Sequence, residues 1–239
     1  MPKRLALIGL AVLTVVALGL TWMALTRTGA SPATTGTPAT QPAPNDSQPA
    51  TNPSTPATPS TTPTNQTEAT LVILGDGYSA ASPWPRYAGE LLDLTVVNMA
   101  ASGTGFHVTP RTCPQTPCTS FKDSAEKVAE HNPKVIVIAG GEVDGDYDLE
   151  PDATATLNEL QAAAPNATIV FMSPISARPS HPAWLNQHAE TLKTVAANGN
   201  AVWVDTSSIT ARSSSYRSGD LTDESSQQIA TLLAEGLNQ

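Results

Sequence analysis

The stretch LVILGDGYSA, residues 71–80, indicates the fold of this protein most directly. Its first four residues are apolar and partly β-branched, and the run ends at Gly75-Asp76. This is the pattern of a short buried strand that is followed by a tight turn. The next position is Gly77, which has no side chain that could take part in a reaction.

Four more apolar runs of the same kind follow along the chain. They are short, rich in Val and Ile, and bounded by Gly, Asn, Pro or Asp, as buried strands are. The predicted strands are residues 70–75, 95–100, 134–140, 168–173 and 201–205. The predicted helices lie between and after them, at about 84–92, 120–131, 152–164, 182–197 and 223–237. Strands that alternate with helices predict an α/β domain with a parallel five-stranded sheet and helices on both faces.

The N-terminal segment is expected to be a membrane anchor. Residues 5–25 contain no charged residue, and about twenty apolar residues are enough to span a bilayer. Lys3 and Arg4 lie in residues 1–4, so the positive-inside rule puts this end in the cytoplasm and the rest outside. The alternative is a signal peptide cleaved near residues 28–30, although signal peptides have shorter apolar regions. We therefore expect a single-pass protein of the cell membrane or, alternatively, a secreted one.

Residues 31–69 are expected to form a disordered linker ahead of a folded domain at 70–239. The linker consists almost entirely of Pro, Thr, Ala, Ser, Asn and Gln, with Asp46 and Glu68 as its charged residues. It lacks the large apolar side chains whose burial offsets the entropy of folding. Its prolines favour extended polyproline II, so the segment is suited to be a stalk.

The charge of the chain argues against nucleic acid as a partner. The formal net charge is −9, and the sequence has no cluster of Lys and Arg to contact phosphates. We expect a monomer that needs no cofactor.

The two cysteines, Cys113 and Cys118, are expected to form a local disulfide. Closely spaced cysteines in an exported chain are most simply paired with each other. A metal site would need two further ligands, and no histidine lies beside them in the sequence. We therefore expect no metal there.

Ligands of a parallel sheet bind beyond the carboxyl ends of its strands, so the residues that follow the strands are the candidate site residues. Four segments qualify. They are Asp76–Ser79, Ala101–Gly105, Gly141–Asp144 and the loop SSSYRSGDLTDESSQQIA at 213–230.

The order and spacing of these segments resemble those of the SGNH/GDSL hydrolases over nearly all of residues 70–239. The resemblance implies a three-layer αβα, flavodoxin-like fold and the chemistry of esterases. In that family the first segment reads Gly-Asp-Ser, and Gly77 stands here in place of the serine. The second segment matches well, and Gly103 would offer its backbone N–H to an oxyanion. The third segment reads Gly-x-Asn-Asp in the family, and Val143 replaces the asparagine.

The last segment of the family, Asp-x-x-His, also differs. One alignment puts Arg217 at the aspartate and Asp220 at the histidine, which suggests a salt bridge in place of a His–Asp pair. A shifted alignment puts Asp220 at the aspartate and Asp223 at the histidine. Neither alignment offers an imidazole.

These substitutions predict a domain that has lost the usual reaction of the family. Ester hydrolysis of this type needs a nucleophile, a base and donors for the oxyanion. Gly77 has no nucleophilic atom, and the carboxylate of Asp220 is too weak a base to activate a serine well at neutral pH. Val143 lacks a donor, and losing such a donor alone costs about 10²–10³ in rate.

Other residues could replace the missing groups. A displaced pair of Ser79 and His107 is the most plausible basis for an active enzyme. For His107 the simpler interpretation is a loop residue without a catalytic role. His131 and His188 are expected to be solvated helix residues, and His181 a loop residue that caps a helix.

Acidic and aromatic residues near the four segments are candidates for binding a ligand, because aromatic faces beside carboxylates suit sugar rings. The candidate ligand-binding residues are Asp76, Tyr78, Gly103, Glu142, Asp144 and Asp220. Trp84, Tyr147 and Tyr216 are aromatic as well, and ordinary packing is the simpler interpretation for all four aromatic residues.

The acidic run at 144–152 resembles a calcium loop but lacks the required Gly and Glu, where Leu149 and Ala155 stand. It is predicted to be a solvated loop. A weak cation site formed with Asp76, Glu142 or Asp220 is the alternative.

Two functions remain open from the sequence. The first is a non-catalytic domain that binds an envelope glycan, an acylated ligand or a protein of the membrane or envelope. The second is an active serine esterase or acyltransferase that acts on carbohydrate or lipid esters. The missing catalytic groups favour the first.

Overall fold

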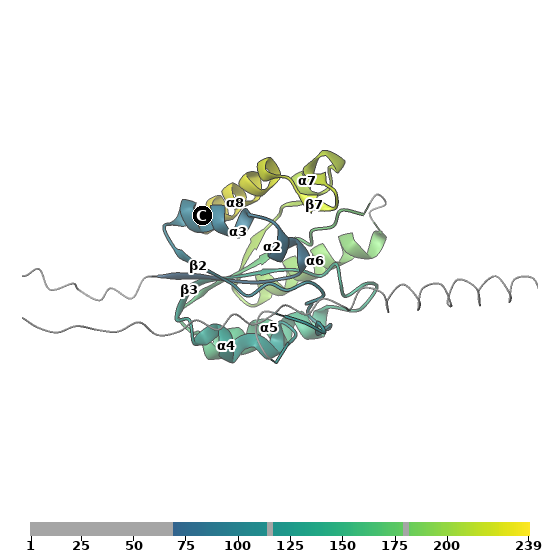
Figure 1. Ribbon diagram of the computed structural model, residues 1–239. Coiled ribbons are helices and arrows are strands. Elements are labelled where there is room, and N and C mark those ends of the chain that lie inside the picture. Colours follow the sequence, from purple (N-terminus) through teal and green to yellow (C-terminus); the bar gives the residue numbers. More distant parts are fainter. Residues whose placement is uncertain (1–68, 114–116, 179–181) are drawn as a thin grey trace, which may run out of the picture. The chain divides into compact units, whose positions relative to one another are not determined.

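The computed structural model describes residues 69–113, 117–178 and 182–239 (Figure 1). The predicted membrane span at 5–25 and the linker up to residue 68 lie outside the described residues. Within the described ranges, no helix is both long enough and apolar enough to cross a membrane.

Five parallel strands form the central sheet in the order β2-β1-β3-β4-β5. The strands are β1 (Thr70–Gly75), β2 (Thr95–Asn98), β3 (Pro133–Ala139), β4 (Thr168–Met172) and β5 (Val202–Val204). All five predicted strands are confirmed. From β1 the chain continues to β2 on one side of it, and then crosses to β3 on the other side. The strand order therefore reverses between β1 and β3, and sheets of this type bind their ligands at such a point.

Two layers of helices cover the sheet, so the predicted three-layer αβα architecture is confirmed (Figure 1). One layer contains α4 (Ala125–Ala129), α5 (Glu150–Ala163) and α6 (Ala183–Asn198). The other contains α3 (Trp84–Leu92) and α8 (Asp223–Leu237). The predicted helix at 120–131 is shorter in the structure, because Lys122–Ser124 form a 3₁₀ turn ahead of α4.

The residues of β1 show why the central strands are apolar throughout. Val72 and Leu74 are buried under the layer of α4, α5 and α6, whereas Leu71 and Ile73 are buried under α3 and α8. Successive side chains of a strand point to opposite faces, and here both faces are covered. The continuous apolar run therefore fills two cores.

The short elements at the carboxyl end of the sheet were not predicted. The five-residue helix α2 (Gly77–Ala81) directly follows β1. An antiparallel hairpin is formed by β6 (Tyr216–Arg217) and β7 (Asp220–Leu221). Ser218 and Gly219 join its strands with φ values of 56° and 97°, which is the geometry of a two-residue type I′ turn.

A disulfide joins Cys113 and Cys118, as predicted. Their Cα atoms are 5.6 Å apart, which is within the normal range for a bonded pair. The bond lies in the long connection between β2 and β3.

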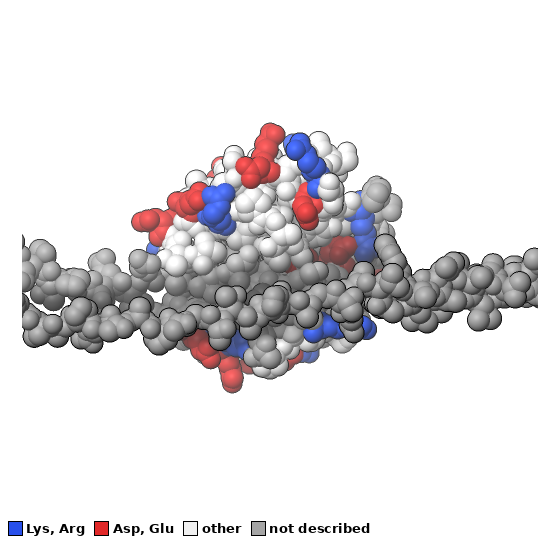
Figure 2. All heavy atoms as spheres, in the orientation of Figure 1, with Lys and Arg blue, Asp and Glu red and all other residues white. Residues whose placement is uncertain are grey.

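Lys and Arg side chains are scattered among Asp and Glu on the face of the domain shown in Figure 2. The described residues on this face form no basic patch of the kind that nucleic-acid binding requires.

Candidate functional site

Residues from all four predicted segments line one open cleft at the carboxyl ends of β1 and β3. Its volume is about 520 Å³. The lining residues are Asp76, Gly77, Tyr78, Ala80, Ala81, Ser102, Gly103, Glu142, Val143, Gly219 and Asp220. The fold thus brings together the groups that the resemblance assigns to a catalytic site.

A larger depression of about 1050 Å³ lies along α3 and the edge strand β2. None of the four segments contributes to it, and its charged lining residues are Arg86, Glu90 and Asp93. Arg86 and Glu90 form an exposed ion pair one helical turn apart. The larger depression lies away from the carboxyl ends of β1 and β3, where the strand order reverses. The smaller cleft, which lies there, is therefore the candidate site.

Gly77 is the first residue of α2 and lies in the lining of the cleft. A Cβ atom at this position would lie 3.3 Å from Ser102 Oγ and 3.7 Å from Ser102 Cα. Ser102 is exposed and can shift by the small distance needed. The backbone of Gly77 does not have a positive φ, so the fold does not require glycine here.

Gly103, in contrast, has a φ of +83°, which other residues rarely adopt. It lies in a turn closed by a hydrogen bond from Thr104 N–H to Ala101 O, 3.1 Å long. The backbone N–H groups of Gly103 and Gly77 make no hydrogen bond to any other described residue. Both are therefore available to an acceptor on a ligand.

Asn98, the last residue of β2, connects the second segment to α2. Its side chain donates to Ser79 O and accepts from Ala100 N–H, both at 3.0 Å. The turn that carries Gly103 is therefore held against the helix that begins at Gly77.

Asp76 lies almost completely buried beside the cleft, with an exposed fraction of 1%. One carboxyl oxygen, Oδ1, accepts from Tyr78 N–H at 3.0 Å. The other, Oδ2, has no hydrogen-bond partner among the described residues. Burial, supported by the nearby carboxylates of Glu142 and Asp144, raises the pKa of Asp76 to about 7. This carboxyl group is thus poised between its two protonation states near neutral pH.

Glu142 forms an ion pair with Arg178 at the edge of the cleft. The guanidinium of Arg178 also lies over the ring of Trp184, 5.8 Å from its centre. Arg178 was not predicted as a site residue. It lies in the loop after β4, so the same rule that pointed to the other strand ends could have included it.

Asp220 lines the cleft, whereas Asp223 does not. Asp223 accepts a hydrogen bond from the hydroxyl of Tyr87 on α3, at 2.8 Å. The predicted salt bridge between Arg217 and Asp220 is wrong: the two residues are opposite each other in the hairpin, but they form no ion pair. Both are exposed, and an ion pair in water gains too little free energy to fix two mobile side chains.

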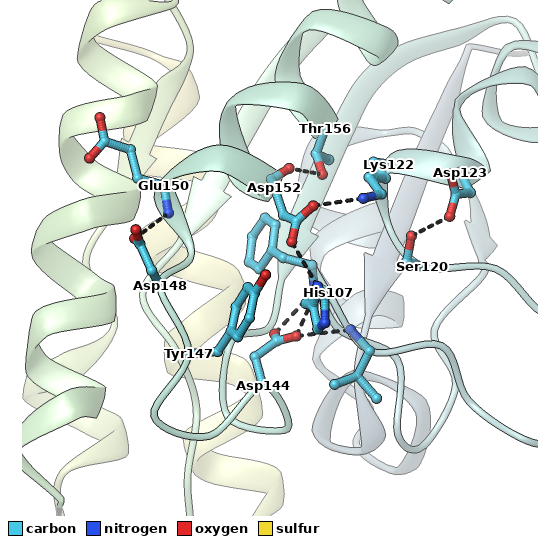
Figure 3. A network of polar contacts seen from close by, with 12 residues as sticks. His107, Ser120, Lys122, Asp123, Asp144, Tyr147, Asp148, Glu150, Asp152 and Thr156 are labelled. Carbon is cyan, nitrogen blue, oxygen red and sulfur yellow. Dashed lines mark hydrogen bonds and ion pairs between the residues drawn. The ribbon is translucent and has the colours of Figure 1, made fainter.

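The structure does not bring Ser79 and His107 together. Ser79 is fully buried in α2. His107 Nδ1 lies 3.0 Å from Asp152 Oδ2, and its ring stacks on Tyr147 with 4.0 Å between centres (Figure 3). Lys122 donates to the other oxygen of Asp152 at 2.7 Å. Neither member of the predicted pair lines the cleft.

The residues around His107 form a network that the sequence did not predict (Figure 3). Burial opposes the ionisation of Asp152, but hydrogen bonds from Lys122 and His107 outweigh it and lower the pKa of this carboxyl group. Asp152 and Lys122 thus neutralise each other within the network. No simple signal in the sequence pairs residues that lie 30 positions apart.

Asp144 corrects the prediction of a solvated acidic loop. It is only 8% exposed, and its carboxylate accepts from the backbone N–H groups of Phe106, His107 and Val108 at 2.9–3.1 Å. These three hydrogen bonds compensate for the burial of the carboxylate, which would otherwise lose its contacts with water. Asp144 therefore holds the backbone of residues 106–108 in place and does not line the cleft.

Only residues 146–148 of the acidic run agree with a solvated loop, because Leu149 and Asp152 are buried and α5 begins at Glu150. Asp146, Tyr147 and Asp148 are exposed, and Asp148 accepts from Glu150 N–H at 3.2 Å. In the part of the chain that the structure describes, no three His, Cys, Asp or Glu side chains are grouped so that they could hold a metal ion.

His188 is buried, which corrects the prediction that it is solvated. Its exposed fraction is 3%. Its Nδ1 lies 2.9 Å from Gly141 O and its Nε2 lies 3.0 Å from Tyr147 O. Helix α6 covers the loop after β3, and the ring places one nitrogen against each of two carbonyl oxygens of that loop, of which the nitrogen that carries the proton donates. His131 is exposed as predicted, and His181 lies outside the described residues.

Of the four aromatic candidates, only Tyr78 lines the cleft. Its hydroxyl accepts from Ala177 N–H at 2.8 Å, and its ring packs edge-on against Tyr216 at 6.1 Å. Burial raises the pKa of both tyrosines. Trp84 is fully buried, and Tyr147 stacks on His107, so packing explains these two.

With its sheet order and its cleft at the ends of β1 and β3, the chain has the fold of the SGNH/GDSL hydrolases. Three solved structures illustrate the likeness. A candidate GDSL-like lipase from Parabacteroides merdae is 14% identical, with a TM-score of 0.57, and the match covers 72% of this chain and 96% of the lipase. An acetylxylan esterase from Geobacillus stearothermophilus is 16% identical, with a TM-score of 0.54 and coverage of 72% and 94%. A candidate SGNH hydrolase from Slackia heliotrinireducens is 19% identical, with a TM-score of 0.54 and coverage of 71% and 99%.

The TM-scores establish a common fold, and at identities this low the likeness shows no more than that. No protein-family model matches the sequence, and no curated protein matches it significantly. The groups in the cleft are therefore the basis for its function.

Proposed function

We propose that this domain binds an acylated carbohydrate of the cell envelope in the cleft without hydrolysing it. The observation that carries the proposal is Gly77. It lies in the cleft, and the sequence resemblance aligns it with the family's serine; its backbone conformation would accept a side chain, yet it brings no hydroxyl. The residues that line the cleft also include no histidine to act as a base.

The groups that remain in the cleft are those of a binding site. The free N–H groups of Gly77 and Gly103 can donate to the carbonyl oxygen of an acyl group. Tyr78 adds an aromatic surface, and Glu142 and Asp220 add acceptors for hydroxyl groups. The acetylxylan esterase among the similar folds acts on an acylated carbohydrate, which supports the choice of this ligand class.

The proposal includes a location outside the membrane. The uncharged residues 5–25 would act as the anchor, and residues 31–69 as a stalk that carries the domain into the envelope. The disulfide between Cys113 and Cys118 supports export, since disulfides persist in oxidising compartments.

The non-catalytic part of the proposal is tested by activity measurements on the purified full-length protein. We expect no turnover of short-chain aryl esters above buffer and no labelling by a fluorophosphonate probe. Gly77→Ser alone should stay nearly inert, because the new hydroxyl would have neither a base nor a complete oxyanion hole.

Recovery of activity should require the combined variant Gly77→Ser, Val143→Asn, Arg217→Asp and Asp220→His, since catalytic groups that act as a unit are not additive. Wild-type turnover that disappears in Ser102→Ala, Ser79→Ala or His107→Ala would show an active enzyme with a displaced site. Ser102 belongs in this set because it is the one Ser or Thr among the residues that line the cleft.

A further inference from the structure

We propose that the acyl group held in the cleft is an amide, such as the N-acyl group of an amino sugar, and not an ester. This inference rests on the proposed function, because it names the ligand class of the same cleft. An amide and an ester share the carbonyl oxygen and differ at the next atom. The amide has an N–H donor where the ester has an oxygen that can only accept a hydrogen bond.

The carbonyl oxygen of either group would be bound by the backbone of the cleft. Gly77 and Gly103 both line it, and their N–H groups have no acceptor among the described residues. The positive φ of Gly103 and the contact of its segment with α2 through Asn98 fix the direction of these donors. They favour any carbonyl and do not distinguish the two ligands.

Asp220 supplies the distinction. It stands where one alignment places the family's histidine, which in its protonated form donates to the leaving oxygen of an ester. A carboxylate can only accept a hydrogen bond, so the group that meets Asp220 must be a donor. An ester oxygen would face the carboxylate as a second acceptor, whereas an amide N–H would be its partner. Asp220 forms no ion pair within the described residues that would occupy it instead.

Asp76 is another group of the cleft lining whose hydrogen bonding within the chain is incomplete. It belongs to the lining, is 1% exposed, and its Oδ2 has no hydrogen-bond partner in the described parts of the chain. Buried polar atoms are nearly always paired in folded proteins, either within the chain or with a ligand or water. Asp76 Oδ2 thus lacks the partner that such an atom usually has, although it is shielded from solvent and shares this property with four other side-chain atoms of the described residues.

A cationic amine is the competing ligand, because the cleft lining contains carboxylates and no Lys, Arg or His. Two features disfavour it. Arg178 already neutralises Glu142, and the N–H groups of Gly77 and Gly103 would point at the hydrogens of an ammonium group. An amide uses the donors and the acceptor of the cleft together.

Calorimetric titration of the purified full-length protein tests the inference with three defined tetrasaccharides. They are N-acetylated chitotetraose, its fully deacetylated form, and O-acetylated xylotetraose. We expect the N-acetylated ligand to bind at least about tenfold more tightly than the other two, since losing a charge-assisted hydrogen bond has about this effect. Circular dichroism checks the fold of the wild type and of the variants Asp220→Ala, Glu224→Ala and Asp220→His.

Two variants that each remove one carboxylate then locate the effect. Asp220→Ala should weaken binding of N-acetylated chitotetraose about tenfold. Glu224→Ala should leave it unchanged, because Glu224 is exposed and lies outside the cleft. Asp220→His should shift the preference toward O-acetylated xylotetraose, because a protonated imidazole offers a donor at the same place.

Each contrary result has a separate meaning. Equal or tighter binding of O-acetylated xylotetraose by the wild type overturns the amide inference and leaves acyl-carbohydrate binding intact. Tighter binding of the deacetylated ligand shows a cation site, and binding of none of the three also overturns the inference. Ester turnover or fluorophosphonate labelling by the wild type instead overturns the non-catalytic function.

Discussion

Asp76 shows at the scale of a single residue how this cleft departs from an ordinary protein surface. Its Oδ1 accepts from Tyr78 N–H, whereas its Oδ2 has no hydrogen-bond partner among the described residues. The carboxylates of Glu142 and Asp144 are near enough to raise its pKa further, after burial itself. In the folded protein this group therefore favours the protonated form far above the pH at which a free aspartate ionises.

The first prediction concerns the stability of the fold as a function of pH. The pKa of Asp76 is about 7 in the folded state and 3.8 in the reference state, so the contribution of its protonated form to stability is lost as the pH rises from about 4 to 7. The loss amounts to about 4 kcal/mol. Asp76→Asn, which keeps an oxygen to accept from Tyr78, should match the wild type near pH 4 and exceed it in stability by about this amount at pH 8.

The measurement is urea unfolding of both proteins between pH 4 and 8, with Asp146→Asn as the control because Asp146 is exposed. A constant difference between wild type and Asp76→Asn across this range would show that Asp76 ionises normally in the fold.

At the scale of elements, the cleft depends on two loops that follow β2 and β3, the strands on either side of β1. One loop carries Ser102 and Gly103, and the other carries Glu142 and Val143. Asp144 joins them, because its carboxylate accepts three backbone donors of residues 106–108. The approach is so close that a Cβ atom at position 105 would lie 2.4 Å from this carboxylate. One side chain thus joins the two loops through three hydrogen bonds.

The second prediction is that Asp144→Ala destabilises the fold by about 3 kcal/mol, because one buried and two part-buried N–H groups lose a charged acceptor at once. Asp146→Ala, two residues away in the same loop and exposed, should change the free energy of unfolding by less than about 0.5 kcal/mol. Urea unfolding at pH 7 compares them. Equal stabilities of the two variants would mean that the loops are held together by other contacts.

At the scale of the whole molecule, the described domain accounts for residues 69–239 apart from two short gaps. The N-terminal part contributes a predicted span at 5–25 and a predicted linker at 31–69, and both belong to the proposed function. Cys113 and Cys118 are bonded, which is compatible with a domain that folds outside the cytoplasm.

The third prediction concerns topology. Protease added to intact cells should release a fragment of the size of residues 70–239, because the proline- and threonine-rich linker would be accessible outside the membrane. Cells whose membranes have been broken serve as the control for total protein. Protection of the domain until the membrane is broken would contradict the orientation, and release of soluble protein without protease would indicate a cleaved signal peptide.

The sequence by itself determined the architecture and the four segments of the site. The strands were recognisable because burial on both faces demands continuous apolar runs, which is a local property of the chain. The segments were recognisable because a parallel sheet collects the residues that follow its strands at one edge. Gly77 and Gly103 both lie in the cleft for this reason.

Only the tertiary structure decided which polar side chains are buried and with which partners. Asp144 and His188 were expected in solvent, yet each is buried against backbone groups that lie more than 30 positions away in the sequence. Arg217 and Asp220 were expected to pair but do not, because a hairpin exposes both to water. Burial and pairing depend on segments that are distant in the chain, so a local pattern of residue types does not contain this information.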